Sequence, residues 1–435
     1  MHISALLLSI ATIARAWNVQ KSDLELPSNA AAKAQEAINL FTSAYADYRK
    51  YAWGHDSLAP INKTFIDDRN GWGATIVDAM STMKIMGLEE LFAEAVDFSS
   101  KIDFNRSKTS DNVSLFETTI RYLGGLISAY ELGGRKDQAL VDRARDVGNK
   151  LSNGWQGSND FPYNNLNFTT DIPVIEESGI AVAGTLILEW AKLTEYTGNK
   201  TYLELAEKSM RRIGMNDSPL PGLPAQGIDP STGKPVGDYI TATGIGPEVF
   251  AYIGLDGNYT GVSPTASDLE FYQKNGFYVY NNYAYYDLRP EVLESNFYAW
   301  RATGNIKYFD RAVSGLESIK KYCTPGVGVA GINDVRSQNS TYIDHTESFF
   351  FAEVIKYIYL TFDEPEKYSL DKYVFNTEAH PFEAPDPIQS FKPPQRAQTG
   401  GHLPSKPWDG QVPQISNAPG VQKKLSDIIE QVLGL

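Results

Sequence analysis

The chain has 435 residues with 39 basic and 53 acidic side chains, which give a net charge of −14. At about 150 residues per domain this length allows three domains, although a large helical barrel can use it as one unit. No run of Lys or Arg exceeds two residues, so the sequence offers no basic surface for a phosphate backbone and excludes nucleic acid as a partner. A hydrophobic content of 42% excludes global disorder. No apolar stretch after the N-terminus reaches the roughly 18 residues of a membrane span.

The chain has few cysteines and histidines, which limits the kinds of metal site it can form. Cys323 is the single cysteine, and there are five histidines. These numbers exclude a disulfide framework and a cysteine-built zinc site, and they do not favour a multi-histidine cluster. We expect any bound metal to be a hard cation held by oxygen ligands.

The N-terminus has the pattern of a secretory signal. Residues 3–13 are apolar and precede Ala14-Arg15-Ala16, a small-x-small site that would release residues 1–16. A frayed helix is the alternative interpretation. Eight N-x-Ser/Thr sequons fit passage through the secretory route; they start at Asn62, Asn105, Asn112, Asn167, Asn199, Asn216, Asn258 and Asn339. The C-terminal Val-Leu-Gly-Leu is no retention signal, so the sequence predicts a secreted protein.

Apolar residues recur at three- and four-residue spacing in six segments, as in amphipathic helices. These segments are residues 31–48, 74–86, 115–132, 180–197, 290–302 and 344–362. Four glycines each end one helix just before another begins; they are Gly87, Gly134, Gly198 and Gly304. Repeated helical hairpins form either a solenoid or a closed α/α toroid, and their irregular spacing favours the toroid. The predicted fold class is therefore all-α.

The C-terminal region differs in composition from the helical part. Residues 382–420 contain eight prolines from Pro385 onward, and we expect this stretch to be extended or disordered. A short amphipathic helix near 421–433 follows. The sequence thus predicts a proline-rich tail over 383–435.

Carboxylates in apolar settings are the candidate chemical groups, because the chain has no nucleotide-binding glycine motif and no Gly-x-Ser-x-Gly elbow. Glu117 interrupts the apolar stripe of a long helix, with Arg121 one turn later. The alternative interpretation of this pair is a surface i,i+4 ion pair. Glu291 and Glu294 follow Arg289-Pro290 and share one face at a helix start. Such acids suit sugar hydroxyls and an activated water, or they only complement the helix dipole.

Two further segments near the C-terminus combine aromatic or polar residues with acids. Glu347 and Glu353 flank Phe349-Phe350-Phe351, an arrangement that suits a sugar ring, although core packing is the alternative for at least two of the three rings. Residues 374–381 place polar residues after an apolar run and end at a proline, so they form no amphipathic helix. A buried non-helical segment needs partners for its carbonyls, and a hard cation is one candidate.

Taken in chain order, these segments resemble glycoside hydrolase family 47, the class I α-1,2-mannosidases, in its fungal secreted branch. The matching segments lie within residues 30–382, which we expect to form the barrel domain; they are Tyr51–Gly54, Gly73–Ala79, Ser114–Arg121, Gly184–Trp190, Thr243–Glu248, Arg289–Glu291, Glu347–Phe350 and Asn376–Pro381. The resemblance implies an (α/α) barrel of seven hairpins with a C-terminal plug segment and a Ca²⁺ at its base. It also implies that terminal α-1,2-linked mannose is hydrolysed from high-mannose N-glycans with inversion.

The resemblance also implies a role for individual residues. Glu117 corresponds to the acid-side carboxylate, Glu291 to the base that activates water, and Thr377 to the direct Ca²⁺ ligand. The remaining matches would line the sugar subsite or hold calcium-bound waters; they are Arg121, Arg289, Glu294, Phe349, Glu353 and Glu378. Desolvation in an apolar barrel would raise the pKa of Glu117, and Arg121 would oppose that shift.

The sequence departs from the family pattern in one long segment. Asp229 to Asp238 runs almost directly into Thr243, where relatives carry about a hundred more residues, enough for about two helical hairpins. The absent segment holds the family's third catalytic carboxylate and both halves of its usual disulfide, and Val182 stands where relatives have glutamate. We therefore expect a barrel reduced by about two hairpins. Three interpretations remain: an enzyme of impaired activity, a non-catalytic mannoglycan-binding relative, or a truncated inactive product.

Overall fold

The structure is a computed structural model that describes residues 18–215, 225–239, 266–275, 279 and 284–385. The signal segment, most of the proline-rich tail and the helix expected near 421–433 lie outside these residues. Within the described part, no helix combines the length and the apolar character needed to cross a membrane.

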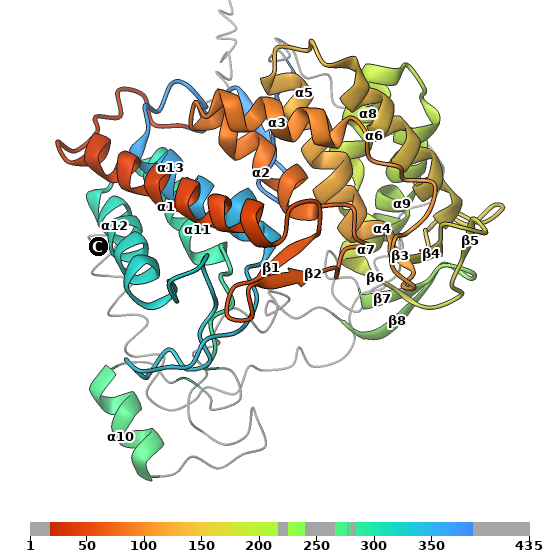
Figure 1. Ribbon diagram of the computed structural model, residues 1–435. Coiled ribbons are helices and arrows are strands. Elements are labelled where there is room, and N and C mark those ends of the chain that lie inside the picture. The colour runs from red at the N-terminus through yellow and green to blue at the C-terminus, as the bar shows by residue number, and fades with distance from the viewer. Residues whose placement is uncertain (1–17, 216–224, 240–265, 276–278, 280–283, 386–435) are drawn as a thin grey trace, which may run out of the picture.

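Five pairs of packed helices make up the described part of the barrel (Figure 1). The pairs are α1 (Ala30–Tyr51) with α13 (Ile355–Phe362), α2 (Ala74–Ile85) with α3 (Glu89–Ser99), α5 (Gly124–Leu132) with α6 (Gln138–Leu151), α8 (Ile187–Thr197) with α9 (Thr201–Met215), and α11 (Glu291–Thr303) with α12 (Ile306–Tyr322). The predicted helical hairpins and the all-α fold class are confirmed.

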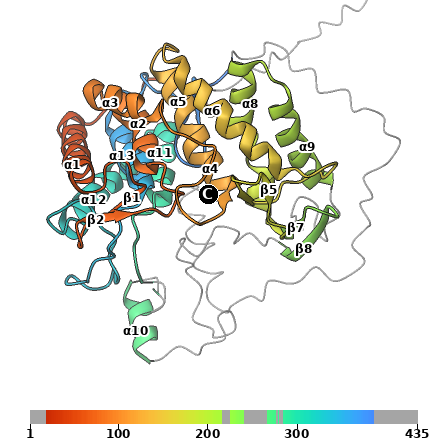
Figure 2. The same ribbon diagram turned by 45° about the vertical axis from the view of Figure 1, so that its right-hand side comes forward.

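The buried helices form a row in the order α8, α5, α2, α13 and α11. Every residue of α13 is buried, as is every residue of α2 except Lys84. The row ends at α8 and α11, which are well separated in Figure 1, with α8 at the upper right and α11 left of centre. Figure 2 shows the same helices from a second direction. Five pairs instead of seven agree with the predicted loss of about two hairpins between α9 and α11.

Outer helices bury only one stripe, as their sequences predict. In α6 the buried residues include Leu140, Ala144, Val147 and Leu151, which recur at helical spacing. Gly198 and Gly304 end α8 and α11 in the left-handed region at φ 73° and 63°, where a residue without Cβ meets no steric cost. The expected glycine stops are therefore confirmed.

Two of the expected helices are less regular than the apolar pattern suggests. Residues 180–197 break at Thr185-Leu186 into α7 (Ile180–Gly184) and α8. The last helix starts at Ser348 instead of residue 344, because Thr346 is extended and its N–H donates to the carbonyl oxygen of Leu58 at 2.8 Å. Apolar spacing alone could not detect that pairing with a distant segment.

Two buried helices contain a π-helical turn, which is a frequent feature of functional sites. The turn η1 (Thr119–Leu123) joins α4 (Leu115–Thr118) to α5, and η4 (Phe350–Val354) precedes α13. The two turns carry Arg121 and Glu353, two of the predicted site residues.

Short antiparallel strands connect the helices. They are β1 (Ser57–Ala59) with β2 (Thr64–Ile66); β3 (Val113–Ser114), β4 (Asn165–Asn167) and β5 (Ile172–Pro173); β6 (Ser178–Gly179), β7 (Ala225–Asp229) and β8 (Lys234–Tyr239); and β9 (Tyr373–Phe375) with β10 (Pro381–Glu383). The 3-10 turn η2 (Ser152–Gly154) and α10 (Ala266–Asn275) complete the described elements.

The β9–β10 hairpin is the predicted plug segment. Ser128 Oγ of α5 donates to the carbonyl oxygen of Pro381 at 2.7 Å, and the N–H of Glu383 donates to Glu131 Oε2 at 2.7 Å. These bonds dock the hairpin on α5. The turn between its strands contains the buried residues Asn376, Glu378 and His380.

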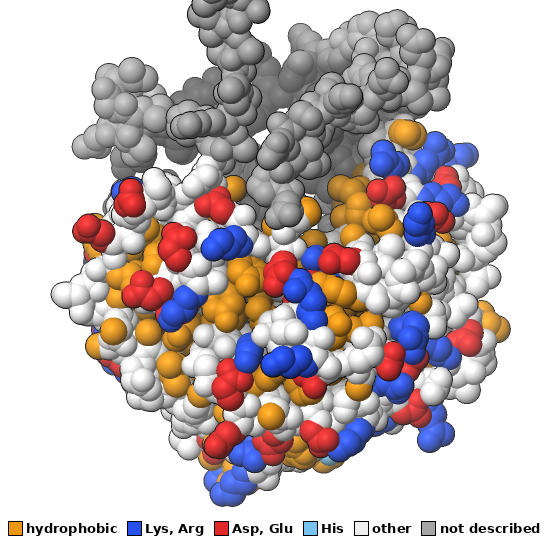
Figure 3. All heavy atoms as spheres, turned by 90° about the horizontal axis from the view of Figure 1, so that it is seen from above, with side chains coloured by type: hydrophobic (Ala, Val, Ile, Leu, Met, Phe, Trp, Pro, Cys, Tyr) orange, Lys and Arg blue, Asp and Glu red, His pale blue; other side chains and the backbone are white. Residues whose placement is uncertain are grey.

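Charges of opposite sign lie close together on the outside of the molecule. Figure 3 shows Lys and Arg interspersed with Asp and Glu on the face seen from above. Ion pairs of this kind include Arg49 with Glu94 and Lys84 with Glu89. This face therefore presents no continuous basic surface.

A buried carboxylate fixes the loop that leads into α2. Asp56 Oδ2 accepts from the N–H groups of Arg69 and Gly71, and Oδ1 accepts from those of Gly73 and Ala74. Its negative charge also lies at the positive end of the helix. Gly73 has φ 85°, and an added Cβ would come within 2.8 Å of Phe98. Asp56 thus satisfies four N–H groups that only this backbone path brings together.

We expect Asp56→Asn to reduce the free energy of unfolding by about 2 to 4 kcal/mol, because an amide presents its own N–H groups to buried donors. Urea denaturation measures this loss. Asp97→Asn on α3 is the matched control, because that side chain is 69% exposed and should change stability by less than about 0.5 kcal/mol. Equal effects of the two substitutions would contradict the assignment.

Candidate active site

The guanidinium of Arg121 is the centre of the candidate site. Nε donates to Glu117 Oε2 at 2.8 Å, and Nη1 lies 3.4 Å from Asp78 Oδ2 and 3.3 Å from Ser348 Oγ. Nη1 also donates to Glu378 Oε1 in a short ion pair. Arg121 is buried, so these acceptors replace the water that the charge loses.

The groups around Arg121 come from parts of the chain that lie far apart in sequence. Asp78 lies on α2, Ser348 at the start of the last helix, and Glu378 in the β9–β10 turn. The predicted residues Glu117, Arg121 and Glu378 therefore meet in one cluster. Asp78 was not predicted, although it is the single acid of α2 and was a usable signal.

A second group of predicted residues lies beside the ring of Phe349. The guanidinium carbon of Arg289 is 4.9 Å from the ring centroid and that of Arg121 is 5.8 Å from it. Glu294 Oε1 accepts from Tyr357 Oη at 3.1 Å. The charges of Glu291 and Glu294 both act on the buried Glu353. The Phe349 ring thus lies between Arg121 and Arg289, while the acids of α11 act on Glu353 of η4.

The charges around Glu117 favour the ionised form of its carboxyl over the protonated form. Burial raises its pKa, but Arg121 and Arg69 together outweigh burial and hold the pKa of this carboxyl below its ordinary value. Arg69 Nε lies 3.4 Å from Glu117 Oε2. The opposing effect expected of Arg121 is thus present, and Arg69, which was not predicted, adds to it.

Two other carboxyls shift in the opposite direction. Burial raises the pKa of Glu353, and the charge of Glu378 raises it further. Burial also raises the pKa of Glu378, against the lowering effect of Arg121. A cation that binds close to these two carboxyls would therefore stabilise their ionised forms.

The residues near Glu378 fit a hard cation. The donors are oxygen atoms of carboxylates, of the Thr377 hydroxyl and of turn carbonyls, which are the ligands that Ca²⁺ prefers. Thr377 is exposed at the tip of the turn, next to the buried Glu378. Oδ1 of the nearby buried Asp78 has no hydrogen-bond partner among the described residues. An excess of buried acid over buried base at this place is what a divalent cation would balance.

A network of buried side chains holds the turn between β9 and β10 in place. Lys356 Nζ donates to the carbonyl oxygen of Ala379 at 2.6 Å and to Ser81 Oγ at 2.8 Å. Asn376 Oδ1 accepts from the N–H groups of Glu378 and His380. These residues fix the backbone on either side of Thr377. Sequence reasoning missed Lys356 and Ser81, which lie on two different helices.

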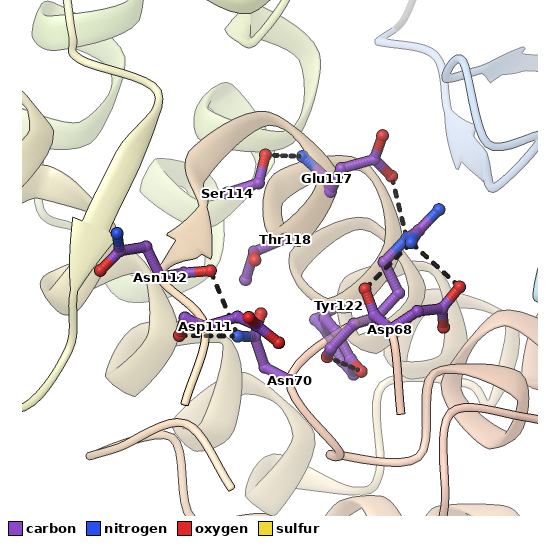
Figure 4. A pocket seen from close by; sticks show the side chains of 9 residues that line it. Asp68, Asn70, Asp111, Asn112, Ser114, Glu117, Thr118 and Tyr122 are labelled. Carbon is purple, nitrogen blue, oxygen red and sulfur yellow. Dashed lines mark hydrogen bonds and ion pairs between the residues drawn. The ribbon is translucent and has the colours of Figure 1, made fainter. Parts of the chain in front are cut away.

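A pocket of about 240 Å³ opens beside Glu117. Figure 4 shows Asp68 and Glu117 on one side of it, both joined by ion pairs to Arg69. Its lining residues are Asp68, Arg69, Asn70, Asp111, Asn112, Ser114, Glu117, Thr118 and Tyr122. Glu117 is therefore reachable from this pocket while it also contacts Arg121.

An all-α barrel with carboxylates, arginines and an aromatic ring at its centre has the features of a carbohydrate-active protein. Comparison with known sequences agrees: the family described as glycosyl hydrolase family 47 matches residues 40–242 and 239–384. The chain belongs to this family of glycosidases, as its sequence motifs imply.

Several relatives show the same similarity along most of the chain. A probable mannosyl-oligosaccharide α-1,2-mannosidase 1B of Aspergillus clavatus is 30% identical over 86% of this chain and 98% of the relative. The mannosyl-oligosaccharide α-1,2-mannosidase 1B of Aspergillus oryzae is 31% identical over 88% of this chain and 99% of the relative. The solved α-1,2-mannosidase from Trichoderma reesei superposes with a TM-score of 0.73 at 26% identity, covering 81% of this chain and 99% of that structure.

The comparisons also locate the departure from the family pattern. The Aspergillus clavatus alignment has 514 positions, whereas 86% of this chain is about 374 residues, so the relative has about 140 positions without a counterpart here. The two matched stretches of the family meet at residues 239–242. This is the place where the sequence predicts the omitted segment.

Glu189 on α8 gives the site region a pH-dependent stability. Its Oε1 accepts from Asn376 Nδ2 at 2.7 Å, whereas Oε2 has no partner among the described residues. Burial raises the pKa of Glu189 from 4.5 to about 7. The folded state therefore keeps a proton that the unfolded state releases, so stability is full below about pH 4.5 and falls as the pH rises toward 7.

We expect Glu189→Gln to remove this decrease of stability with rising pH. Between pH 5 and pH 8 the free energy of unfolding of the variant should decrease by about 3 kcal/mol less than that of the wild type. Urea denaturation at the two pH values measures the difference. Glu195→Gln on the same helix is the control, because that side chain is 53% exposed. Parallel pH dependences of wild type and Glu189→Gln would show that the buried carboxyl does not hold the proton.

Proposed function

We propose that the protein is a secreted, Ca²⁺-dependent glycosidase that releases terminal α-1,2-linked mannose from high-mannose N-glycans with inversion. The observation that carries the proposal is the meeting of Glu117 and Arg121, which lie one turn apart on one helix, with the distant Glu378 of the β9–β10 turn in a member of family 47. The α-1,2-mannosidase names of the Aspergillus relatives support the choice of substrate.

In this proposal the Phe349 region binds the terminal mannose. The Phe349 ring offers an apolar face to the sugar, and Arg121 and Arg289 lie against that ring. Glu294, Glu353 and Glu378 accept hydrogen bonds from hydroxyls or from ordered waters. A planar guanidinium donates to two oxygens at once, so the two arginines orient the ring as well as bind it.

The two catalytic roles fall to Glu117 and Glu291. Glu291 acts as the base that takes a proton from the attacking water, and Glu117 acts on the side of the leaving oxygen. In an inverting glycosidase two such carboxyl groups stand roughly 6.5 to 9.5 Å apart to admit the water. Because Arg121 and Arg69 lower the pKa of Glu117, an acid-side role favours an acidic working pH.

Thr377 is the proposed direct ligand of the cation, and Glu353 and Glu378 hold its waters. The ion would supply positive charge that orients sugar hydroxyls and favours ionised acids nearby. Lys356, Asn376 and Ser81 keep the turn in place through the bonds described above.

Export through the secretory route is part of the proposal. All six sequon asparagines in the described residues are exposed, as a glycosylation acceptor must be; they are Asn62, Asn105, Asn112, Asn167, Asn199 and Asn339. Their exposure supports a glycoprotein whose residues 1–16 act as the signal.

A second candidate function is mannoglycan binding without hydrolysis. The specific observation in its favour is the total of about 140 positions of the Aspergillus clavatus relative that have no counterpart in this chain, together with Val182 at a position where the family motif has glutamate. An isothermal titration of the protein with α-1,2-mannobiose that shows heat but no mannose release would select it. Sequencing the transcript across the codons for Lys234 to Thr243 separates both candidates from a truncated product.

We expect Glu291→Gln to reduce kcat for mannose release from α-1,2-mannobiose by about 10² to 10⁴-fold, because an amide cannot take a proton from water. Glu317→Gln on α12 is the control, because that side chain is 59% exposed and should leave kcat unchanged. A Glu291→Gln variant with wild-type kcat would refute the assignment of the base, and a wild type that releases no mannose would refute the enzymatic function.

We also expect removal of divalent cations to abolish mannose release, since the acids near Thr377 would then repel one another. An assay with chelator, followed by one with Ca²⁺ restored, measures this dependence. Thr377→Val removes the hydroxyl at nearly constant volume and should raise the Ca²⁺ concentration needed for half-maximal activity. Full activity in chelator would contradict the calcium role.

A further inference from the structure

Three side chains with metal-binding groups meet in one cluster, and one of them, Asp68, also lines the Glu117 pocket. They are Asp68, from the loop between β2 and α2, and His345 and Glu347, from the extended segment before the last helix. One ligand atom from each lies within 4.8 Å of the other two. The cluster consists of other residues than the Thr377 turn, and its imidazole has carboxylates on two sides, at 3.1 Å from Glu347 and 3.5 Å from Asp68.

The imidazole of His345 is held in a defined orientation. Nδ1 lies 3.1 Å from Glu347 Oε1. Nε2 is buried and has no hydrogen-bond partner among the described residues. Nε2 lies 3.5 Å from Asp68 Oδ2, so a neutral ring with its hydrogen on Nδ1 can offer Nε2 as a ligand beside that carboxylate.

The spacing of these atoms suits two ligands of one ion. His345 Nε2 and Asp68 Oδ2 are 3.5 Å apart, which is long for a hydrogen bond. Two ligands with bonds of about 2.1 Å on a tetrahedral ion lie about 3.4 Å apart. The distance, which is that of an ion pair when the ring is protonated, therefore also fits two ligands of one cation.

We propose that Asp68, His345 and Glu347 bind a first-row divalent cation of the zinc class. His345 Nε2 and Asp68 Oδ2 supply two ligands, a carboxylate oxygen of Glu347 supplies the third, and water takes the open position. One imidazole with two carboxylates is a donor set that suits Zn²⁺ and its neighbours better than Ca²⁺. The side chains of the three residues are 19 to 27% exposed, so the ion can reach the site from solvent.

The ion would change the partner of Arg69. Arg69 Nη1 now lies 3.2 Å from Asp68 Oδ2 and 3.0 Å from the Asp68 carbonyl oxygen. A cation on Oδ2 replaces the first contact, while the second contact and the ion pair with Glu117 remain. The site therefore lies one side chain away from the proposed acid-side carboxylate, although the binding claim does not depend on the proposed function.

The test is a calorimetric titration of Zn²⁺ into the full-length, tag-free protein with Ca²⁺ in excess, so that the Thr377 turn does not take the probe. We expect one Zn²⁺ to bind, and we expect His345→Ala or Asp68→Asn to weaken this binding at least about tenfold. Co²⁺ in place of Zn²⁺ gives a second readout, a visible absorption band that the same variants lose.

His55→Ala is the matched control, because His55 pairs with one carboxylate only, that of Asp67 at 2.9 Å, and has no third ligand. This variant should keep wild-type affinity. Absence of Zn²⁺ binding by the wild type, undiminished binding by the folded His345→Ala and Asp68→Asn variants, or an equal loss in His55→Ala would overturn the proposal. None of these readouts involves mannose release, so a failure here is distinct from a failure of the proposed function.

Discussion

The buried guanidinium of Arg121 is the interaction on which the site depends. Taking this charge out of water costs several kcal/mol, and the cost is offset only if oxygen atoms surround it closely. Asp78, Glu117 and Glu378 meet that requirement from α2, α4 and the β9–β10 turn. Because no two of these segments are adjacent along the chain, the charge can be satisfied only when the barrel and its plug have come together.

The same region holds more negative than positive charge. Arg121 balances part of it, and Glu353 and Glu378 remain with raised pKa values because burial and mutual repulsion disfavour their ionised forms. A network of ion pairs that only stabilises the fold would be most stable with equal numbers of positive and negative charges. An excess of buried acid beside an exposed threonine turn is more readily explained by a cation or a sugar that binds there.

The sequence was sufficient to predict the helices and most of the site, for reasons that are local or motif-based. Apolar spacing marks α1 and α13, and glycines mark the ends of α8 and α11. The sequence could not predict the break in the helix at Thr185-Leu186, because the apolar spacing continues through these residues. Asp78, Arg69 and Glu189 were missed as partners, because their importance lies in contacts with residues more than 40 positions away. The direction in which the pKa of Glu117 shifts likewise could not be predicted without the position of Arg69.

The reduced barrel keeps this constellation because the omitted segment does not contribute to it. The five described helical pairs retain α2, α4, η1, η4 and α11 together with the plug, which carry Arg121, its partners and the Phe349 group. The lost hairpins belong between α9 and α11, at the two ends of the row of inner helices. The Arg121 cluster and the Phe349 group thus persist without the omitted segment.

A double-mutant cycle on Arg121→Met and Glu378→Gln tests the central claim most directly. The free energy of unfolding of the wild type, both single variants and the double variant is measured in urea, with chelator present so that no cation replaces the arginine. The account predicts a coupling free energy of at least about 2 kcal/mol between the two side chains. A coupling near zero would contradict it, because the plug and the barrel would then be joined without this buried charge.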